Sequence, residues 1–416
     1  MTSRARLPAF STVGIELEYM IVDRDTLRVR PIADRLLKAF AGHATSEVRH
    51  GTLGWSNELV RHVIELKNVE PTLSLAALAQ GFQTEVQAAN RALAPFAAQL
   101  MPGGMHPWMD PLAETVLWTH DGRDIYAAYD RIFDCRRHGF ANLQSMHINL
   151  PFADDAQFAR LHAAVRLVLP LLPALAASSP FAEGRSTGFL DYRLEVYRTN
   201  AGALGTIAGS VVPDTATGRA QYEADVLAPM YREIAPFDPS GTLRYEWLNS
   251  RGAIPRFDRN AIEIRLADTQ ECPHADLAIA AAVVETVRAI FDERWAPLAQ
   301  QQAIPTATLA EIFLQTIRDA GSALISDYDL LQALGVRRRR CTASELWAHW
   351  LDGLGSNQAA VGDSGAWWRP AVELMLKEGT LAQRLLRALR GRHQRASLHR
   401  VYATLCQCLD QGRMFR

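Results

Sequence analysis

The feature that most constrains the fold of this chain is a two-residue alternation of apolar and polar side chains in four short segments. The segments are residues 13–22, 62–68, 145–151 and 261–267. Because successive side chains of a β-strand point to opposite faces, each segment predicts a strand with one apolar and one polar face. The polar faces carry Glu16 and Glu18, Glu65 and Lys67, His147 and Asn149, and Glu263 and Arg265. An antiparallel sheet built from these strands would gather the polar residues on one face.

The carboxylates of this polar face indicate a cation site. For any single strand, a water-exposed polar face is the simpler interpretation. Taken together, five carboxylates would crowd one concave face, with Glu58 on the approach to Glu65 and with His147 as the only histidine. Like charges at this range raise one another's pKa values or demand a cation. Oxygen ligands with one imidazole suit Mg²⁺ or Mn²⁺ better than Zn²⁺.

Arginines supply the second part of the predicted site. Planar, permanently charged guanidinium groups suit a phosphoryl group in transfer. The candidates are Arg185, Arg193, Arg251, Arg256 and Arg265. The chain has no GxxxxGK[ST] motif, no GxGxxG after a strand and no HExxH motif. Any ATP site is therefore of neither the Walker nor the Rossmann type.

The organisation of the chain changes near residue 300. All strand-like segments precede it, and helical periodicity dominates beyond Pro305. We therefore expect an α+β catalytic domain over residues 1–300 and a helical C-terminal extension over residues 301–416, packed on the same body. Pro95 is expected to end or kink the first long helix. The clearest helices are predicted over residues 76–100, 155–177 and 274–290.

Composition argues against several classes of function. With 44 Lys+Arg against 45 Asp+Glu, the formal net charge of −1 provides no overall field for nucleic acid or an anionic membrane. The run 337–340, four arginines, is expected to be a solvated surface. The most apolar stretch, residues 161–181, is interrupted by Arg166, Pro170 and Pro173, which predicts a buried helix and no membrane span. Five scattered cysteines without a CxxC pair, and no signal peptide, favour a cytoplasmic protein without disulfides.

Five separated segments resemble glutamate-cysteine ligase family 2, the carboxylate-amine ligases. In this sequence they read GIELE at 14–18, NELV through VIELK at 57–67, MHIN at 146–149, SSPF through GRSTG at 178–188, and IEIRLAD at 262–268. The resemblance implies a fold related to glutamine synthetase, a curved antiparallel sheet that makes a funnel with helices packed outside. It also implies an ATP-dependent ligation, in which a substrate carboxylate becomes an acyl phosphate, ADP is released, and an amine displaces the phosphate.

The same resemblance implies roles for individual residues. Those that look like ligands of two or three Mg²⁺ ions are Glu16, Glu18, Glu58, Glu65, His147 and Glu263. Those that look like clamps on the phosphate or acyl phosphate are Arg265 and Arg251, and those assigned to substrates are Arg185, Arg193, Asn149 and Arg256. The implied partners are ATP and small amino acids. The sequence leaves open whether the chain forms a homo-oligomer. Departures from the family pattern at 144–149 and 247–251 fall in the substrate pocket, so the substrates are not named.

Two other functions stay open from the residues alone. A two-metal carboxylate site can activate water in a hydrolase of amides or phosphoesters, although the number of arginines favours the ligase. A catalytically silent relative would fail to bind Mg-ATP. The segment 103–125, which contains His106 and His120, is a candidate mobile lid over the site.

Overall fold

The structure of the protein is a computed structural model that describes residues 6–354 and 365–416. Within these residues, an eight-stranded antiparallel sheet has the order β2-β3-β4-β1-β6-β10-β9, and β5 pairs with the end of β1. Its strands are β1 (Gly14–Asp23), β2 (Glu47–His50), β3 (Leu53–Asn57), β4 (Val63–Asn68), β5 (Ala98–Met101), β6 (Ser145–Pro151), β9 (Ala253–Arg256) and β10 (Ala261–Asp268). Two separate strand pairs are β7 (Phe181–Ala182) with β8 (Arg185–Ser186), and β11 (Leu324–Ile325) with β12 (Cys341–Thr342).

The four strands predicted from the alternating pattern are present as β1, β4, β6 and β10, each within one residue of its expected bounds. Their apolar residues, including Ile15, Leu17, Ile148 and Leu266, are fully buried. Strands β2, β3, β5 and β9 are only four or five residues long and were not predicted from the alternating pattern. The predicted α+β fold, with an antiparallel sheet and a helical C-terminal region, is confirmed.

Three helices cover the apolar face of the sheet: α2 (Leu75–Leu93), α6 (Asp155–Val168) and α12 (Pro273–Phe291). Helix α12 packs on both α6 and α2, and it is buried along nearly its whole length. The first helix begins where the Ser74 hydroxyl accepts a hydrogen bond from the Ala77 N–H, and the second begins with the same cap from Asp154 to Gln157. Pro273 suits the first turn of α12 because it has no N–H to leave unpaired.

Prolines shortened two of the predicted helices. Helix α2 ends at Leu93, and a 3₁₀ turn containing Pro95 leads through Ala97, which has a φ of 51°, into β5. The helix therefore does not reach residue 100, because the chain reverses there to pair with β1, and the expectation that Pro95 ends this helix early is confirmed. The predicted helix 155–177 is divided into α6, a 3₁₀ turn and α7 (Pro173–Ala176), since Pro170 and Pro173 interrupt it.

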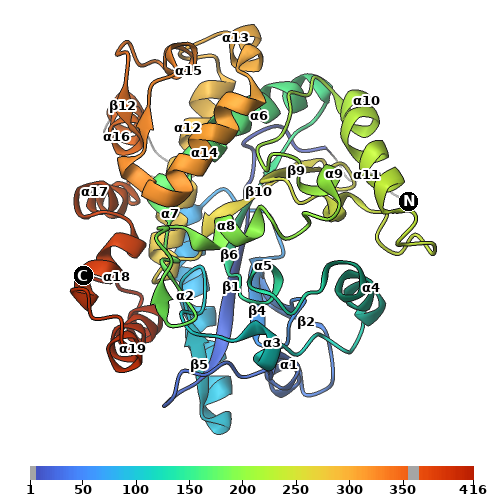
Figure 1. Ribbon diagram of the computed structural model, residues 1–416, viewed down its shortest axis with the longest axis vertical. Coiled ribbons are helices and arrows are strands. Elements are labelled where there is room, and N and C mark those ends of the chain that lie inside the picture. The colour runs from blue at the N-terminus through green and yellow to red at the C-terminus, as the bar shows by residue number, and fades with distance from the viewer. Residues whose placement is uncertain (1–5, 355–364) are drawn as a thin grey trace.

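The remaining helices surround this core (Figure 1). Before residue 300 begin α1 (Ala33–Ala41), α3 (Pro111–Glu114), α4 (Arg123–Phe133), α5 (His138–Ala141), α8 (Tyr192–Tyr197), α9 (Gly205–Ala208), α10 (Arg219–Tyr222), α11 (Ala228–Ile234) and α13 (Leu298–Ala303). Beyond it are α14 (Thr306–Asp319), α15 (Tyr328–Ala333), α16 (Ala343–Leu354), α17 (Arg369–Glu378), α18 (Leu381–Leu389) and α19 (Arg395–Gln411).

The C-terminal helices continue the same hydrophobic core. Figure 1 shows α16 to α19 along one side of the molecule, with α4 and α10 on the opposite side. Helices α16 and α17 pack on α12, and α19 packs on α2 and β5. The largest buried apolar cluster runs from Phe10 to Leu409 and includes Trp347, Trp350 and Trp368. The boundary predicted at residue 300 stays a prediction.

Several surface and segment predictions can be placed on the structure. The four arginines at 337–340 are exposed in the loop before β12. All five cysteines are buried and free. Among the described residues, no helix has the length and apolar character to cross a bilayer. The first part of the candidate lid, residues 103–109, is buried, and the His106 ring lies 2.7 Å from the Leu27 carbonyl oxygen. This stretch is therefore a packed part of the core, and only residues 110–125 are largely exposed.

Buried His162 predicts an acid-sensitive fold. Its ring packs between Phe158 and Tyr222, at centroid distances of 5.4 and 5.9 Å, and burial lowers its pKa from 6.5 to about 3. As the pH falls below 6.5, the unfolded chain binds a proton that the folded chain does not. The free energy of unfolding should therefore fall between pH 6.5 and about 3, by up to ~1.4 kcal/mol per pH unit from this group.

The measurement is the melting temperature between pH 7 and pH 4 for the wild type and His162→Leu. The variant should lose less stability on acidification, because one of the groups that protonates only on unfolding is gone. The exposed His349→Leu is the matched control and should follow the wild type. Equal acid slopes for wild type and His162→Leu would contradict this account of the buried ring.

Candidate active site

The sheet register brings the predicted polar residues together on the face away from α2, α6 and α12. Directly opposed residues of antiparallel strands share a face. Glu16 of β1 lies opposite Lys67 of β4 on one side and His147 of β6 on the other. Glu18 lies opposite Glu65. The central strand β1 therefore carries two carboxylates, and the neighbouring strands add further polar side chains to the same face. We call this surface the acidic face; its members are Glu16, Glu18, Glu58, Glu65, Lys67, His147 and Glu263.

Hydrogen bonds from β6 fix the two carboxylates of β1. The His147 Nδ1 atom lies 2.9 Å from Glu16 Oε2, and Asn149 Nδ2 donates to Glu16 Oε1 at 3.2 Å. The backbone N–H and hydroxyl of Ser145 both donate to Glu18 Oε2, at 2.6 and 2.9 Å. Because both carboxylates are held from the same strand, their orientation follows from the β1–β6 register.

The β4 side of the acidic face carries the least compensated charge. Glu65 Oε1 accepts hydrogen bonds from Ser56 Oγ at 2.7 Å and from Lys67 Nζ at 2.9 Å. Glu58 follows β3, and burial together with the charges of Glu65 and Glu18 raises its pKa well above 4.5. Burial is the largest cause of this shift, and the neighbouring carboxylates add to it.

The β10 side of the acidic face is balanced by arginine. Arg256 NH1 donates to Glu263 Oε2 at 3.1 Å, and Arg265 contacts Glu263 Oε1. A β-bulge sets Arg265 and Leu266 against the single residue His147, which alters the direction of the side chains at this point. Burial alone would raise the pKa of Glu263, but Arg265, His147 and Arg256 outweigh it and lower the pKa to about 2.

His147 joins the two halves of the acidic face. Its Nδ1 atom is 3.8 Å from Glu263 Oε1 as well as 2.9 Å from Glu16, and its Nε2 atom is 3.1 Å from Ser145 Oγ. Burial would lower its pKa, but the hydrogen bond and charge of Glu16 raise the pKa to about 9. The imidazole is thus a cation at neutral pH when carboxylates are its only partners.

The donor set fits a hard divalent cation. One ligand atom from each of Glu16, Glu65 and His147 lies within 4.8 Å of the other two. Two carboxylates with one imidazole match Mg²⁺ or Mn²⁺ chemistry. Glu18, which lies opposite Glu65 in the sheet register, is on the same face.

The predicted arginines divide into two groups. Arg256 and Arg265 lie on the acidic face through their contacts with Glu263. Arg251 does not contact it: its buried guanidinium donates to the carbonyl of Thr206 at 3.0 Å and to Asn249 Oδ1 at 3.2 Å. Of the two arginines expected to bind the phosphate, only Arg265 therefore lies on the acidic face. Arg256, which was expected to bind substrate, lies beside it.

The two arginines assigned to substrate lie elsewhere. Arg193 is only 1% exposed and is paired with buried Asp268, so it stabilises the packing behind Glu18 and is not placed to meet a substrate. Arg185 is exposed on the β7–β8 turn, with its guanidinium 2.8 Å from Glu183. Both arginines lie near the same glycine-containing loop in the sequence, and this proximity does not show where each side chain points. The sequence alone therefore could not distinguish the buried Arg193 from the exposed Arg185.

Several residues of the acidic face were not predicted as site residues. Ser56, Ser145 and Lys67 bind its carboxylates directly, and Tyr126 of α4 accepts a hydrogen bond from Asn57 at 3.0 Å. The two-residue period contains the signal for Ser145 and Lys67, which share strand faces with assigned residues. No such signal exists for Tyr126, because α4 is distant in the sequence.

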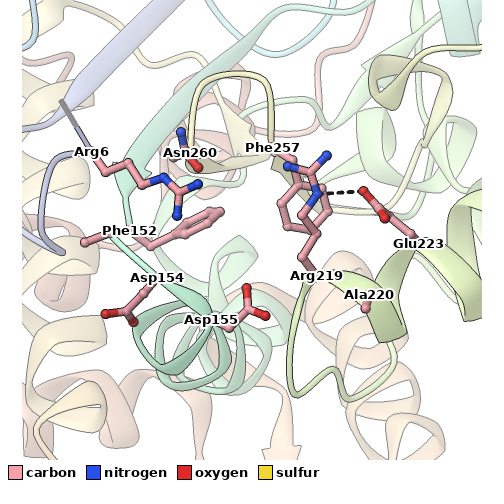
Figure 2. A pocket seen from close by; sticks show the side chains of 10 residues that line it. Arg6, Phe152, Asp154, Asp155, Arg219, Ala220, Glu223, Phe257 and Asn260 are labelled. Atoms are coloured by element: carbon pink, nitrogen blue, oxygen red, sulfur yellow. Dashed lines mark hydrogen bonds and ion pairs between the residues drawn. The ribbon is translucent and has the colours of Figure 1, made fainter. Parts of the chain in front are cut away.

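Two cavities lie outside this site. One of about 250 Å³ lies at the start of α6, where Arg219 stacks on Phe257 and pairs with Glu223 (Figure 2). The other, of about 760 Å³, lies between α1 and the segment 119–124. Neither is lined by a residue predicted for the site.

The fold and the site define a class of protein. The crystal structure of a glutamate–cysteine ligase from Francisella tularensis in complex with AMP matches this chain with a TM-score of 0.64 at 11% identity, covering 95% of this chain and 88% of the other. The chain therefore has the fold of that ligase. The chain belongs to glutamate-cysteine ligase family 2, whose model matches residues 12–404. The resemblance stated from the separated motifs is confirmed.

The relatives of the chain differ in their sequence identity to it and in how much of each protein the match covers. An uncharacterized protein of Archaeoglobus fulgidus is 35% identical over 281 residues, 68% of this chain and 75% of its own. A protein named "Putative glutamate--cysteine ligase 2" from Rhodospirillum rubrum is 30% identical over 227 residues, so the match spans about half of each protein, 53%. A protein of the same name from Herpetosiphon aurantiacus is 25% identical over 384 residues, 90% of this chain and 88% of its own.

We expect loss of the buried ion pair between Asp268 and Arg193 to lower the free energy of unfolding strongly. Asp268 accepts hydrogen bonds from Ser178 N at 2.9 Å and Ser179 Oγ at 2.7 Å, and it neutralises Arg193. Asp268→Asn removes the carboxylate that pairs directly with this buried guanidinium and leaves only the more distant charge of Asp191, so the free energy of unfolding should fall by ~3–5 kcal/mol in urea denaturation. Asp319→Asn, which removes an exposed pair with Arg318, should cost less than about 1 kcal/mol. Similar losses for both variants would contradict the assignment.

Proposed function

We propose that the protein is an ATP-dependent carboxylate-amine ligase that activates an amino acid carboxylate as an acyl phosphate, releases ADP and forms an amide with an amine. The observation that carries the proposal is one sheet face on which the ligand atoms of Glu16, Glu65 and His147 converge beside Arg256 and Arg265. Membership of glutamate-cysteine ligase family 2 supports the same reaction class.

Carboxylates and His147 hold the metal in this proposal. The predicted ligands are Glu16, Glu18, Glu58, Glu65, His147 and Glu263, for two or three Mg²⁺ ions with Mn²⁺ as a substitute. A bound divalent ion would neutralise the charge of the ATP phosphates. To ligate, His147 must release its proton, and Ser145 and Asn149 keep the carboxylates of β1 oriented while that happens.

Arg265 and Arg256 act on the transferring group. Their guanidinium groups are held at the acidic face by Glu263, and each keeps further N–H groups that can bind phosphate oxygens. Stabilising charge that develops in the transition state needs donors that are already oriented, and the two contacts with Glu263 provide that orientation. Arg251 and Asn149 remain candidates for a phosphate and a substrate contact, respectively, once substrates are bound.

The substrates of this proposal are ATP and small amino acids. The Francisella protein was crystallised with AMP, and the named relatives suggest glutamate and cysteine as the first pair to test. Neither nucleic acid nor a membrane is a partner in this proposal, the protein acts in the cytoplasm, and a homo-oligomer is compatible with it. A hydrolase would instead consume an amide or phosphoester without an amine acceptor.

An ATP-consumption screen tests the reaction. Purified protein is supplied with Mg-ATP and pairs of amino acids, and ADP release should depend on both a carboxylate and an amine substrate. Glu16→Gln removes one ligand charge at constant shape, so turnover should fall by about 1,000-fold or more while the circular dichroism spectrum is unchanged. Wild-type turnover in this variant, or ADP release with no amine requirement, would overturn the proposal.

Glu263→Gln tests the arginine pair. The substitution removes the charge that orients Arg256 and Arg265, so ligase turnover should be abolished although the chain still folds. Mn²⁺ binding by the folded variant should persist through Glu16, Glu65 and His147. Glu183→Gln, at the exposed partner of Arg185, is the matched control and should keep full activity. Activity retained in Glu263→Gln would remove this residue from the site.

A further inference from the structure

Lys67 places a permanent cation inside the acidic face. Its Nζ atom lies 2.9 Å from Glu65 Oε1 and donates to Ser56 Oγ at 2.8 Å. Across the sheet it is opposed by Glu16 on β1 and by Gly54 on β3. Its side chain is only 29% exposed, so protein surrounds most of the ammonium group.

The positive charge of Lys67 lies beside Glu65, a carboxylate that has no other cationic partner among the described residues. Glu263 faces two arginines and Glu16 faces His147, whereas in the described part of the chain Glu65 has Lys67 as its only ion-pair partner. Glu65 Oε1 is occupied by the ammonium and by a hydroxyl, and its second oxygen makes no hydrogen bond to the described residues. Lys67 therefore directs one oxygen of Glu65 and leaves the other available.

The choice of lysine is chemically specific. Only three lysines, Lys38, Lys67 and Lys377, occur among the 44 basic Lys and Arg residues of the chain. A guanidinium is planar and extended, whereas an ammonium is a compact point charge with three donors. At this one place within the acidic face, the chain uses the compact cation.

We propose that Lys67 is a fixed cation of the metal site, whose ammonium takes the place of one divalent ion beside Glu65 and so lowers the number and affinity of the ions bound without nucleotide. The inference rests on the proposed metal site. Its physical basis is repulsion: a tethered positive charge among the same carboxylates opposes the entry of a further cation. Lys67 is thus a positioning residue for Glu65 and for the ions, and it needs no contact with substrate.

Mn²⁺ binding to the nucleotide-free full chain tests the inference. Lys67→Met and Lys67→Gln remove the charge, so Mn²⁺ titrations followed by electron paramagnetic resonance and calorimetry should show one further ion per chain or a dissociation constant about tenfold lower. Lys67→Arg keeps the positive charge, although not its compact shape, and should bind Mn²⁺ no more tightly than the wild type. The exposed Lys377→Met is the matched control. A larger rise in melting temperature on adding Mn²⁺ to the two uncharged variants gives a second readout.

The outcomes separate this inference from the function on which it rests. Unchanged or weaker Mn²⁺ binding in the folded uncharged variants, with normal binding by the wild type, overturns the role of Lys67 and leaves the metal site intact. Absence of Mn²⁺ binding by the wild type itself overturns the metal site and this inference together. Tighter binding in Lys67→Met and Lys67→Gln, but not in Lys67→Arg, supports it.

Discussion

Charge balance across one face of an antiparallel sheet is the constraint on which the rest of this molecule depends. Five carboxylates cannot share that face in water-poor surroundings unless cations lie among them. Two arginines balance Glu263, His147 balances Glu16, and Lys67 balances Glu65. On the side of Glu58, burial and the charges of Glu65 and Glu18 together raise the pKa of its carboxyl group.

Burial of the apolar side chains on the opposite face of the same sheet stabilises the strands that carry these charges. Ile15, Leu17 and their neighbours on β6 and β10 are buried against α2, α6 and α12. A one-residue slip of β1 would move its carboxylates into that core, so hydrophobic burial holds the register that aligns the charged side chains. The C-terminal helices extend the same core and thereby stabilise the site from a distance.

The alternating segments predicted β1, β4, β6 and β10 closely, because the two-residue period is a local property of the backbone. They also predicted which residues share the acidic face. The arginines were harder, since a guanidinium can reach several partners and its choice depends on elements far apart in the chain. Arg193 meets Asp268, 75 residues away, and Arg251 meets backbone carbonyls near Thr206. Short strands such as β5 were missed because four residues carry too little periodicity.

The antiparallel sheet, the sidedness of its strands and the carboxylates of the acidic face were predictable from the order of residues alone, because they follow from spacing along the backbone. The family was identified from the sequence through the resemblance of five separated segments. The packed molecule was needed to show that Arg193 is neutralised, that Arg256 and Arg265 share Glu263, and that Lys67 lies between Glu65 and Glu16. The physical reason is that pairing between charges depends on distances in space, which strand register and bulges set, whereas alternation depends only on neighbours in sequence.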